Sequence, residues 1–300
     1  MRILLGTDGS EHANLARDLV ASIGWPAASI IRVVTAVEPA EVVLGAPWAG
    51  GLLAEMDALE GELVAHGQSV VDETVRGIPQ GTWSVETAVL RGGAAHSIVH
   101  EARQFGADTI VVGSRGHGAI ASMLLGSVAA EVVDHAPCPV LVARQPRLTR
   151  VVLAHDGSDY ALGAEALLSN WPIFGETAIE VVSVAQQRGP WHLPSSATLY
   201  APSVPDYFAS YRSVVEEHTQ IAQQASERLR SAGLHAAPVV VEGDPAASLL
   251  RVADERQADL ILLGTHGRTG LRRMLLGSVA RNVLQHAPVS VLVVRPVAGQ

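Results

Sequence analysis

The sequence predicts an α/β fold built from two similar, doubly wound domains in tandem. Three observations support this prediction. Strand-like and helix-like segments alternate along the chain, the second half repeats motifs of the first, and 48% of the residues are hydrophobic, which is ample for two packed cores. Three hundred residues fit two domains of about 150 residues each. We therefore expect one domain over residues 1–145 and another over 150–300, each with a five-stranded, mostly parallel sheet and helices on both faces.

The first half contains five strand patterns and four helix patterns. Short apolar or β-branched runs predict strands over 3–6, 30–37, 84–90, 109–112 and 140–143. Amphipathic segments predict helices over 11–23, 54–76, 94–105 and 127–135. Residues 38–53, rich in Gly, Pro and Ala, are predicted to form a loop. Strands that alternate with helices in this way favour parallel pairing within one sheet.

The second half repeats this order after a short link at residues 144–150. Its predicted strands cover 151–154, 179–184, 237–241, 260–263 and 290–294. Its predicted helices cover 159–171, 211–232, 245–256 and 278–285. A longer loop is predicted at 186–210, with Trp191, Tyr200 and Tyr207 in it. Because long loops often carry function, we expect the loops at 38–53 and 186–210 to set the choice of an unknown protein partner.

Charge and composition exclude several classes of function. The net charge is −9 and the basic residues form no cluster, which argues against nucleic-acid binding. All 21 basic residues are arginines, so the lysine of a Walker-type phosphate loop and a Schiff-base lysine are both absent. No apolar run reaches the roughly 18 to 20 residues of a membrane span, and we do not expect a secretory signal at the N-terminus. The single cysteine, Cys138, suits a reducing cytoplasm and is predicted to be a small buried side chain.

One glycine frame occurs in both halves. Residues 113–116 (Gly-Ser-Arg-Gly) are followed by nine residues and then by Gly126-Ser127. Residues 264–267 (Gly-Thr-His-Gly) are likewise followed by nine residues and then by Gly277-Ser278. The two copies lie 151 positions apart. Each copy is preceded by an Ala-Asp pair and an apolar run, and each is followed by His-Ala-Pro. An Asp-Gly-Ser triplet lies near the start of each half, at residues 8 and 156.

These repeated motifs predict a phosphate-binding site in each half. Ligands of doubly wound sheets bind at the carboxyl ends of the strands, near the point where the strand order reverses. A helix N-terminus offers unpaired N–H groups and positive partial charge, and glycines let the backbone approach a phosphate closely. The sites are expected at Asp8, residues 113–118 and Ser127, and at Asp156, residues 264–270 and Ser278. The alternative is that the aspartates and serines are simple N-caps of the helices that follow them.

Basic side chains in the two glycine loops are further candidates. Arg115 and His117 in the first loop, and His266 and Arg268 in the second, either reach phosphates or remain solvated. His155 borders the second site. The histidines show no metal-ligand spacing, so we expect no metal site built from them alone.

The repeated frame resembles the ATP-binding signature of the universal stress protein family. The Asp-Gly-Ser triplets, the Ala-Asp strand before the glycines and the apolar strand after His-Ala-Pro are also similar to that family. The resemblance covers nearly the whole chain, as a tandem pair. It implies two Rossmann-like domains of the adenine nucleotide α hydrolase type, with ATP and Mg²⁺ as ligands. Adenine and ribose would lie near strand one and the end of strand two, and the phosphates on the glycine loop and the Gly-Ser helix start.

The resemblance implies a set of site residues in each half. The first site would comprise Gly6, Thr7, Asp8, Ala36, Val37, Val112, Gly113, Arg115, Gly116, Gly126, Ser127 and Val128. The second would comprise Ala154, His155, Asp156, Val184, Ala185, Leu263, Gly264, His266, Gly267, Gly277, Ser278 and Val279. Arg115 stands where a histidine is common in the family. His155 occupies a crowded position before Asp156, which would narrow the second adenine pocket and make the two sites unequal.

The resemblance further implies a cytoplasmic, ATP-binding stress-response or regulatory protein. Nucleotide occupancy would alter partner binding, and any ATP hydrolysis would be slow. The last strands of the halves would pair, and tandem chains would form a homodimer, with no nucleic-acid or membrane partner. Two alternatives remain open: a slow ATP hydrolase or nucleotidyl transferase on the same fold, and a nucleotide-free dimerisation scaffold whose glycine loops are only tight turns. AMP or a cyclic nucleotide would fit the same cleft.

Overall fold

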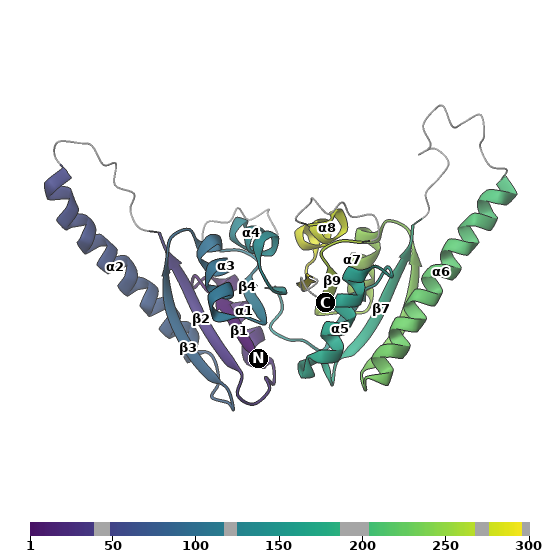
Figure 1. Cartoon of the computed structure of the whole chain (residues 1–300), viewed down its shortest axis with the longest axis horizontal. Helices are drawn as coiled ribbons and strands as arrows, with labels where there is room; N and C mark the ends of the chain where they lie inside the picture. The colour runs from purple at the N-terminus through teal and green to yellow at the C-terminus, as the bar shows by residue number, and fades with distance from the viewer. Residues whose placement is uncertain (39–48, 117–124, 187–203, 268–275, 296–300) are drawn as a thin grey trace. The chain divides into compact units, whose positions relative to one another are not determined.

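The computed structural model describes residues 1–38, 49–116, 125–186, 204–267 and 276–295. The chain forms two compact units whose main division lies between Leu148 and Thr149. Each unit is an α/β domain with a parallel sheet, as the alternation of strand and helix patterns predicts (Figure 1). In each unit, the helices labelled in Figure 1 pack against the strands of the sheet.

The sheet of the first unit has the strand order β3-β2-β1-β4-β5. Its strands are β1 (Arg2–Gly6), β2 (Ile30–Val37), β3 (Ser84–Arg91), β4 (Thr109–Gly113) and β5 (Val140–Ala143). All four neighbouring pairs are parallel. The helices are α1 (Glu11–Ser22), α2 (Ala49–Arg76), α3 (Ala94–Phe105) and α4 (Ser127–His135).

The second unit repeats this topology, with the strand order β10-β9-β6-β7-β8. Its strands are β6 (Arg150–Ala154), β7 (Ala178–Ala185), β8 (His235–Glu242), β9 (Leu260–Gly264) and β10 (Ser290–Val294). Its helices are α5 (Asp159–Asn170), the 3₁₀ turn η1 (Pro172–Phe174), α6 (Val204–Ser231), α7 (Pro245–Glu255) and α8 (Ser278–His286). The strands β6 and β7, β6 and β9, and β7 and β8 pair in parallel.

The central strands are apolar throughout because both of their faces are covered by helices. Ile3, Leu4 and Leu5 of β1 are fully buried, and so are Leu260 and Ile261 of β9. Parallel strands buried on both faces carry continuous apolar runs rather than alternating ones. The sheet cores of the two units therefore follow directly from the apolar runs in the sequence.

The helices begin and end at residues with clear local causes. Ser10 caps α1 by accepting a hydrogen bond from the N–H of Ala13, and Ser158 caps α5 by accepting one from Ala161. The helix α3 is capped at its C-terminus by Gly106, which adopts the left-handed conformation with φ of 64°. A serine at the N-cap and a glycine after the last turn are favoured for these reasons.

The two long helices differ from the expectation at their starts. The helix α2 begins at Ala49 rather than residue 54, and α6 begins at Val204 rather than residue 211. Tyr207 therefore lies in a helix and not in a loop. Gly50 and Gly51 have low helix propensity, and Pro205 is tolerated only because it stands in the first turn. Trp191, Tyr200 and residues 39–48 lie outside the described residues.

The topology also fixes where a ligand can approach each sheet. In each unit the first strand lies between the second and the fourth, so the connections leave it in opposite directions. Ligands of doubly wound sheets bind at such a reversal, at the carboxyl ends of the first and fourth strands. The reversal places Asp8 beside residues 114–116 and Asp156 beside residues 265–267.

Candidate functional site

A cavity of about 900 Å³ lies at the carboxyl ends of β6 and β9 in the second unit. Residues from α6, α7 and the start of α8 complete its walls. Every position predicted for the second site lines this cavity except Ala185, which is fully buried. The lining positions that the sequence predicts are Ala154, His155, Asp156, Val184, Leu263, Gly264, His266, Gly267, Gly277, Ser278 and Val279.

The aspartate after the first strand of each unit forms a tight turn. Asp156 Oδ1 accepts a hydrogen bond from the Ser158 N–H at 3.0 Å, and Asp8 Oδ1 accepts one from the Ser10 N–H at the same distance. The caps of α5 and α1 are Ser158 and Ser10, so the interpretation of the aspartates as simple N-caps is wrong. Each carboxylate instead closes a turn directly after the carboxyl end of the strand.

The last glycine of each Gly-x-x-Gly segment leaves room for that carboxylate. A Cβ atom on Gly267 would lie 2.6 Å from Asp156 Oδ2, and a Cβ on Gly116 would overlap Asp8 Oδ2. Any side chain at these two positions would force the loop or the carboxylate to shift. The pairing of Asp-Gly-Ser with Gly-x-x-Gly in the sequence thus has a direct steric reason.

The first glycine of each segment has a different role. A Cβ on Gly113 would lie 2.6 Å from the backbone oxygen of His12, and one on Gly264 would lie 2.7 Å from the backbone oxygen of Tyr160. These glycines therefore allow α1 and α5 to pack closely against β4 and β9. Sequence reasoning assigned them to ligand binding and missed this packing contact.

The second end of each glycine loop is closed by a short hydrogen bond. The Gly126 N–H donates to the Ser114 carbonyl, and the Gly277 N–H donates to the Thr265 carbonyl, both at 2.7 Å. Gly126 and Gly277 are the N-cap residues of α4 and α8, and neither makes a side-chain capping bond. The interpretation of Ser127 and Ser278 as caps is therefore wrong.

Ser127 and Ser278 are instead the first residues of α4 and α8, and both are exposed. The N–H groups of a first helical turn have no acceptor within the helix. In each unit these N–H groups and a serine hydroxyl stand beside the aspartate turn and the glycine loop. This arrangement can accept an anionic group.

Basic side chains gather at the loop of the first unit. His12 Nδ1 lies 3.4 Å from Ser114 Oγ, and burial together with the charge of Arg115 lowers the pKa of His12. Burial and the same Arg115 charge lower the pKa of Arg144 to about 10. Arg144 directly follows β5, and its predecessor Ala143 pairs with Gly113. Sequence reasoning missed Arg144, although Arg295 follows the matching strand of the second half.

The remaining predicted positions of the first site lie along the same edge. Thr7 is buried and contacts Thr74 Oγ1 at 3.1 Å, whereas Ala36 and Val37 end β2 and are partly exposed. Gly6 packs against Val112, and Val128 is exposed at the start of α4. His117 and Arg268 lie outside the described residues.

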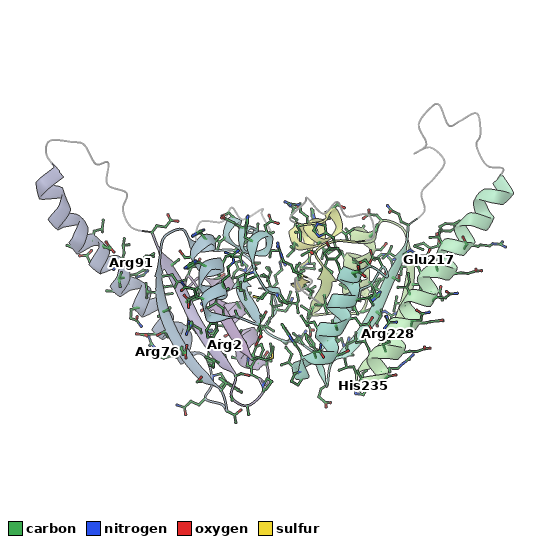
Figure 2. All side chains as sticks on the ribbon, in the orientation of Figure 1. Arg2, Arg76, Arg91, Glu217, Arg228 and His235 are labelled. Atoms are coloured by element: carbon green, nitrogen blue, oxygen red, sulfur yellow. The ribbon has the colours of Figure 1, made fainter. Side chains whose placement is uncertain are left out.

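The helix α6 supplies a polar wall that the sequence did not suggest. Tyr211, Glu217 and His218 line the cavity, and the buried His218 Nδ1 lies 2.8 Å from Ser183 Oγ on β7. In the sequence, the only indication of this polar wall was Ser183, a serine within an otherwise apolar strand. Figure 2 shows Glu217 nearer the start of α6 and Arg228 further along it.

The first unit is built differently at the place that corresponds to His218. Gly9 contacts Val70 and Gly157 contacts Ile221, so positions in α2 and α6 correspond with an offset of 151 and Gly67 matches His218. A Cβ on Gly67 would lie 3.0 to 3.2 Å from side chains of β2 and β3. Thus α2 packs closely on its sheet, while a histidine stands between α6 and β7.

His155 belongs to a buried polar network beneath the cavity. Its side chain is 1% exposed, and Nε2 lies 3.0 Å from Glu165 Oε2 on α5. Arg228 of α6 grips the same carboxylate through Nε at 2.6 Å and Nη2 at 2.8 Å. Burial raises the pKa of Glu165, but the hydrogen bonds from Arg228 and the nearby His155 ring outweigh it and lower that pKa. Glu165 is therefore ionised at neutral pH.

Comparison with known proteins shows which family shares these features. The model of the universal stress protein family matches residues 1–144 and 176–295. A universal stress protein of Mycobacterium tuberculosis is 29% identical over 319 residues, which cover 98% of this chain and 94% of that protein. A universal stress protein of Thermus aquaticus is 34% identical over 142 residues, which cover 47% of this chain and 97% of that protein.

Solved structures share the two-unit fold. The crystal structure of a universal stress protein from Archaeoglobus fulgidus covers 98% of both chains with a TM-score of 0.62 at 19% identity. A putative universal stress protein from Pseudomonas aeruginosa covers 99% of this chain and 93% of its own, with a TM-score of 0.60 at 19% identity. These TM-scores show a shared fold, and at 19% identity the likeness concerns the fold alone.

Proposed function

This chain belongs to the universal stress protein family, and on that basis we propose that it is a stress-response or regulatory protein that binds an adenine nucleotide in each half. The preferred ligand is ATP with Mg²⁺. The observation that carries the proposal is the cavity of the second unit, whose volume of about 900 Å³ falls within the range of small-molecule sites, roughly 300 to 1,000 Å³.

The two ends of the cavity have the chemistry that a nucleotide requires. Ser278 and Val279 offer backbone N–H groups and a hydroxyl at the start of α8, and Arg281 and His266 line the same cavity. A helix N-terminus with basic neighbours suits a phosphate chain. We assign the phosphates to this end.

The base and ribose belong, in this proposal, against the ends of β6 and β7, with Asp156 between them and the phosphates. Ala154 and Val184 are apolar, and Asp156 is a carboxylate that accepts hydrogen bonds from hydroxyl groups. Mg²⁺ prefers carboxylate, phosphate and water oxygens, so Asp156 would be its protein-side neighbour when Mg-ATP is bound. The room that Gly267 leaves beside this carboxylate supports the assignment.

The first unit supports the same proposal through its matching parts. Three features of the first unit correspond to features of the second: the turn at Asp8, the close contact between Gly116 and that aspartate, and the start of α4 without a side-chain cap. Arg115 and Arg144 add positive charge beside the loop, as an anionic ligand needs. We infer that the two sites differ in affinity, because the helices facing them, α2 and α6, pack differently on their sheets.

We further propose a cytoplasmic location. The thiol of Cys138 is buried, and burial together with the charge of Asp108 raises its pKa to about 12, so it is a structural side chain of the kind that a reducing compartment allows. Among the helices that the structure describes, none combines the length and apolar character needed to cross a bilayer.

Isothermal titration with Mg-ATP tests the proposed function. A separate sample of the purified protein is first denatured, and any nucleotide that it releases is identified by chromatography. We expect two binding equivalents, of which Gly116→Val removes one and Gly267→Val the other, because each valine would collide with the neighbouring aspartate. Gly61→Val and Gly163→Val are matched controls in α2 and α5, where a Cβ meets nothing within 4 Å.

The other outcomes separate the alternatives. One equivalent would mean that only one half binds, and the glycine variants would identify it. No binding and no released nucleotide would contradict the proposal and favour a scaffold role. Steady-state release of phosphate that Asp8→Asn or Asp156→Asn abolishes while binding persists would instead indicate an enzyme.

A further inference from the structure

Two histidines stand about one turn apart on α3 of the first unit. His96 and His100 are both exposed, and their ring planes lie within 8° of parallel, with the ring centroids 6.4 Å apart. Residues four positions apart share one face of a helix, with Cβ atoms about 5–6 Å apart. The same spacing joins the two zinc-binding histidines of the H-E-x-x-H helix motif. Sequence reasoning expected no metal site from the histidines and missed that α3 brings this pair together.

The other face of α3 is fixed to the core of the first unit. Ile98, Val99 and Ala102 are buried, and the Ser97 hydroxyl donates a hydrogen bond to the Arg91 carbonyl at 3.1 Å. The helix also packs against α4, which lies beside it in Figure 1. A side-chain pair on such a helix is held more precisely than a pair on a loop.

The separation of the two rings is close to that of two imidazoles bound to one metal ion. A Zn–N distance of about 2.0–2.1 Å and a tetrahedral angle place the centroids of two ligating rings about 5 Å apart. The rings of His96 and His100, at 6.4 Å, therefore need to approach each other by about 1 Å. Exposed side chains make such adjustments on the picosecond to nanosecond timescale.

The surroundings leave the remaining coordination positions of such an ion to water. Within the parts of the chain that the structure describes, no His, Cys, Asp or Glu joins the pair in a cluster of three. Glu101 on the same helix is bound to Arg32 at 2.6 Å, and Arg103 Nη2 donates to the His135 carbonyl at 3.2 Å. Structural zinc sites have four protein ligands, so two ligands indicate an exchangeable ion.

The imidazole nitrogen determines the class of metal ion. Imidazole suits Zn²⁺, Cu²⁺ and Ni²⁺, whereas Mg²⁺ prefers carboxylate, phosphate and water oxygens. A site built from two imidazoles is therefore chemically distinct from a site for Mg-ATP.

The second unit carries other residues at the matching positions. Helices α3 and α7 correspond with an offset of 151, since the Ser97 N–H donates to the Gly93 carbonyl and the Ser248 N–H to the Asp244 carbonyl. Ala247 and Arg251 therefore stand in α7 where His96 and His100 stand in α3, and both are exposed. The two halves thus provide a comparison within one chain.

We propose that His96 and His100 form a binding site for a divalent transition-metal ion, with one imidazole nitrogen from each ring and water at the open positions. Because one rigid helix carries both ligands, the second metal–nitrogen bond forms within the molecule. The pair therefore binds the ion more tightly than a single exposed histidine, by a factor of about 10² or more. This site goes beyond the proposed function and does not require a nucleotide.

Calorimetric titration with ZnCl₂ in a non-chelating buffer, with no nucleotide added, tests the site. His96→Ala and His100→Arg each copy the residue that α7 carries at that position. Each variant should weaken the Zn²⁺ equivalent of the pair by at least about tenfold, because one ligand is left. His135→Ala removes another exposed helical histidine and should leave this equivalent unchanged. If His96→Ala and His100→Arg bind Zn²⁺ as tightly as the wild-type chain, the inference is wrong.

The reverse exchange tests whether the spacing on an exposed helix face is sufficient. The double variant Ala247→His with Arg251→His places the same pair on α7. Its folding should be little affected, because Ala247 is exposed and the ion pair between Arg251 and Glu255 is half exposed. We expect one additional Zn²⁺ equivalent. A folded double variant without this equivalent would contradict the inference.

Imidazole signals in ¹H–¹³C spectra locate the ion on the wild-type chain. The ring signals of His96 and His100 should shift together as Zn²⁺ is added and should reach their end point at the same ratio of metal to protein. MgCl₂ at the same concentration should not shift them. If only one of the two rings responds to Zn²⁺, the ion binds a single histidine and the proposed pair is wrong.

Discussion

Single glycines in the two repeated segments do separate physical tasks. Gly116 and Gly267 leave space for the carboxylates of the aspartate turns. Gly113 and Gly264 allow a helix to cross close to the end of a strand. The sequence pattern treats all four as one phosphate-binding motif, although only the first pair borders the aspartates. A substitution at either position should therefore affect a different property.

At the residue scale, Gly264→Ala should destabilise the second unit. The added methyl group would lie 2.7 Å from the backbone oxygen of Tyr160, so α5 must move. We expect the free energy of unfolding to fall by about 1 to 3 kcal/mol, the usual cost of overpacking. Urea denaturation measures this change.

Gly163→Ala within α5 is the matched control, because nothing lies within 4 Å of its Cβ. The higher helix propensity of alanine should leave the control unchanged or more stable, by up to about 1 kcal/mol. If Gly264→Ala is as stable as the control, the packing role of Gly264 is wrong.

Serines and aspartates near helix starts mark the limit of sequence reasoning at this scale. The sequence offered Asp8, Asp156, Ser127 and Ser278 as caps or ligands, and a residue list cannot distinguish these roles. The structure assigns the caps to other residues, Ser10 among them. Arg144 and the buried His155 network depend on contacts distant in sequence, so no local pattern could reveal their surroundings.

At the scale of elements, the starts of the two long helices were the hardest boundaries to predict from the sequence. The order of strands and helices was predictable, because apolar runs and amphipathic periods persist over whole elements. The starts of α2 and α6 were not, because Gly50, Gly51 and Pro205 resemble loop residues in sequence. The different fit of these helices on their sheets, set by Gly67 and His218, also required the structure.

The ion pair between Glu165 and Arg228 joins α5 to α6, and Arg228→Met should weaken that contact in a pH-dependent way. The folded-state pKa of Glu165 is lowered, so its stabilising effect is present above the unfolded pKa, about 4.3, and is lost as the pH falls through the folded value. We expect the variant to lose about 1 to 2 kcal/mol at pH 7, a moderate value because the Arg228 side chain is half exposed.

Denaturation at pH 7 and pH 3.5 checks this prediction, with Arg251→Met as the control. Arg251 forms an exposed pair with Glu255 on α7, which should contribute little at either pH. The difference between wild type and Arg228→Met should shrink at pH 3.5. A difference that is constant across this range would show that the pair does not link α5 to α6 through charge.

At the scale of the whole molecule, the chain repeats one framework and varies what faces it. The fold class and the two tandem units were predictable, because strand and helix patterns alternate and the glycine frame and the Asp-Gly-Ser triplets recur with fixed spacing. The inequality of the two sites was expected from His155 alone. The structure adds the polar wall of α6 and the basic group around Arg115 as further differences.

The most direct test of the central claim is to map Mg-ATP onto the full chain by amide chemical shifts. The account predicts that saturating Mg-ATP shifts the signals of residues 154–157, 264–267 and 277–280, which line the cavity or form its aspartate turn, and the matching residues 6–9, 113–116 and 126–129 of the first half. The amide signals at the start of strand β8, near His235, should not shift, because this end of the strand is far from the cavity. Saturation without shifts in either set of loop residues would contradict the account.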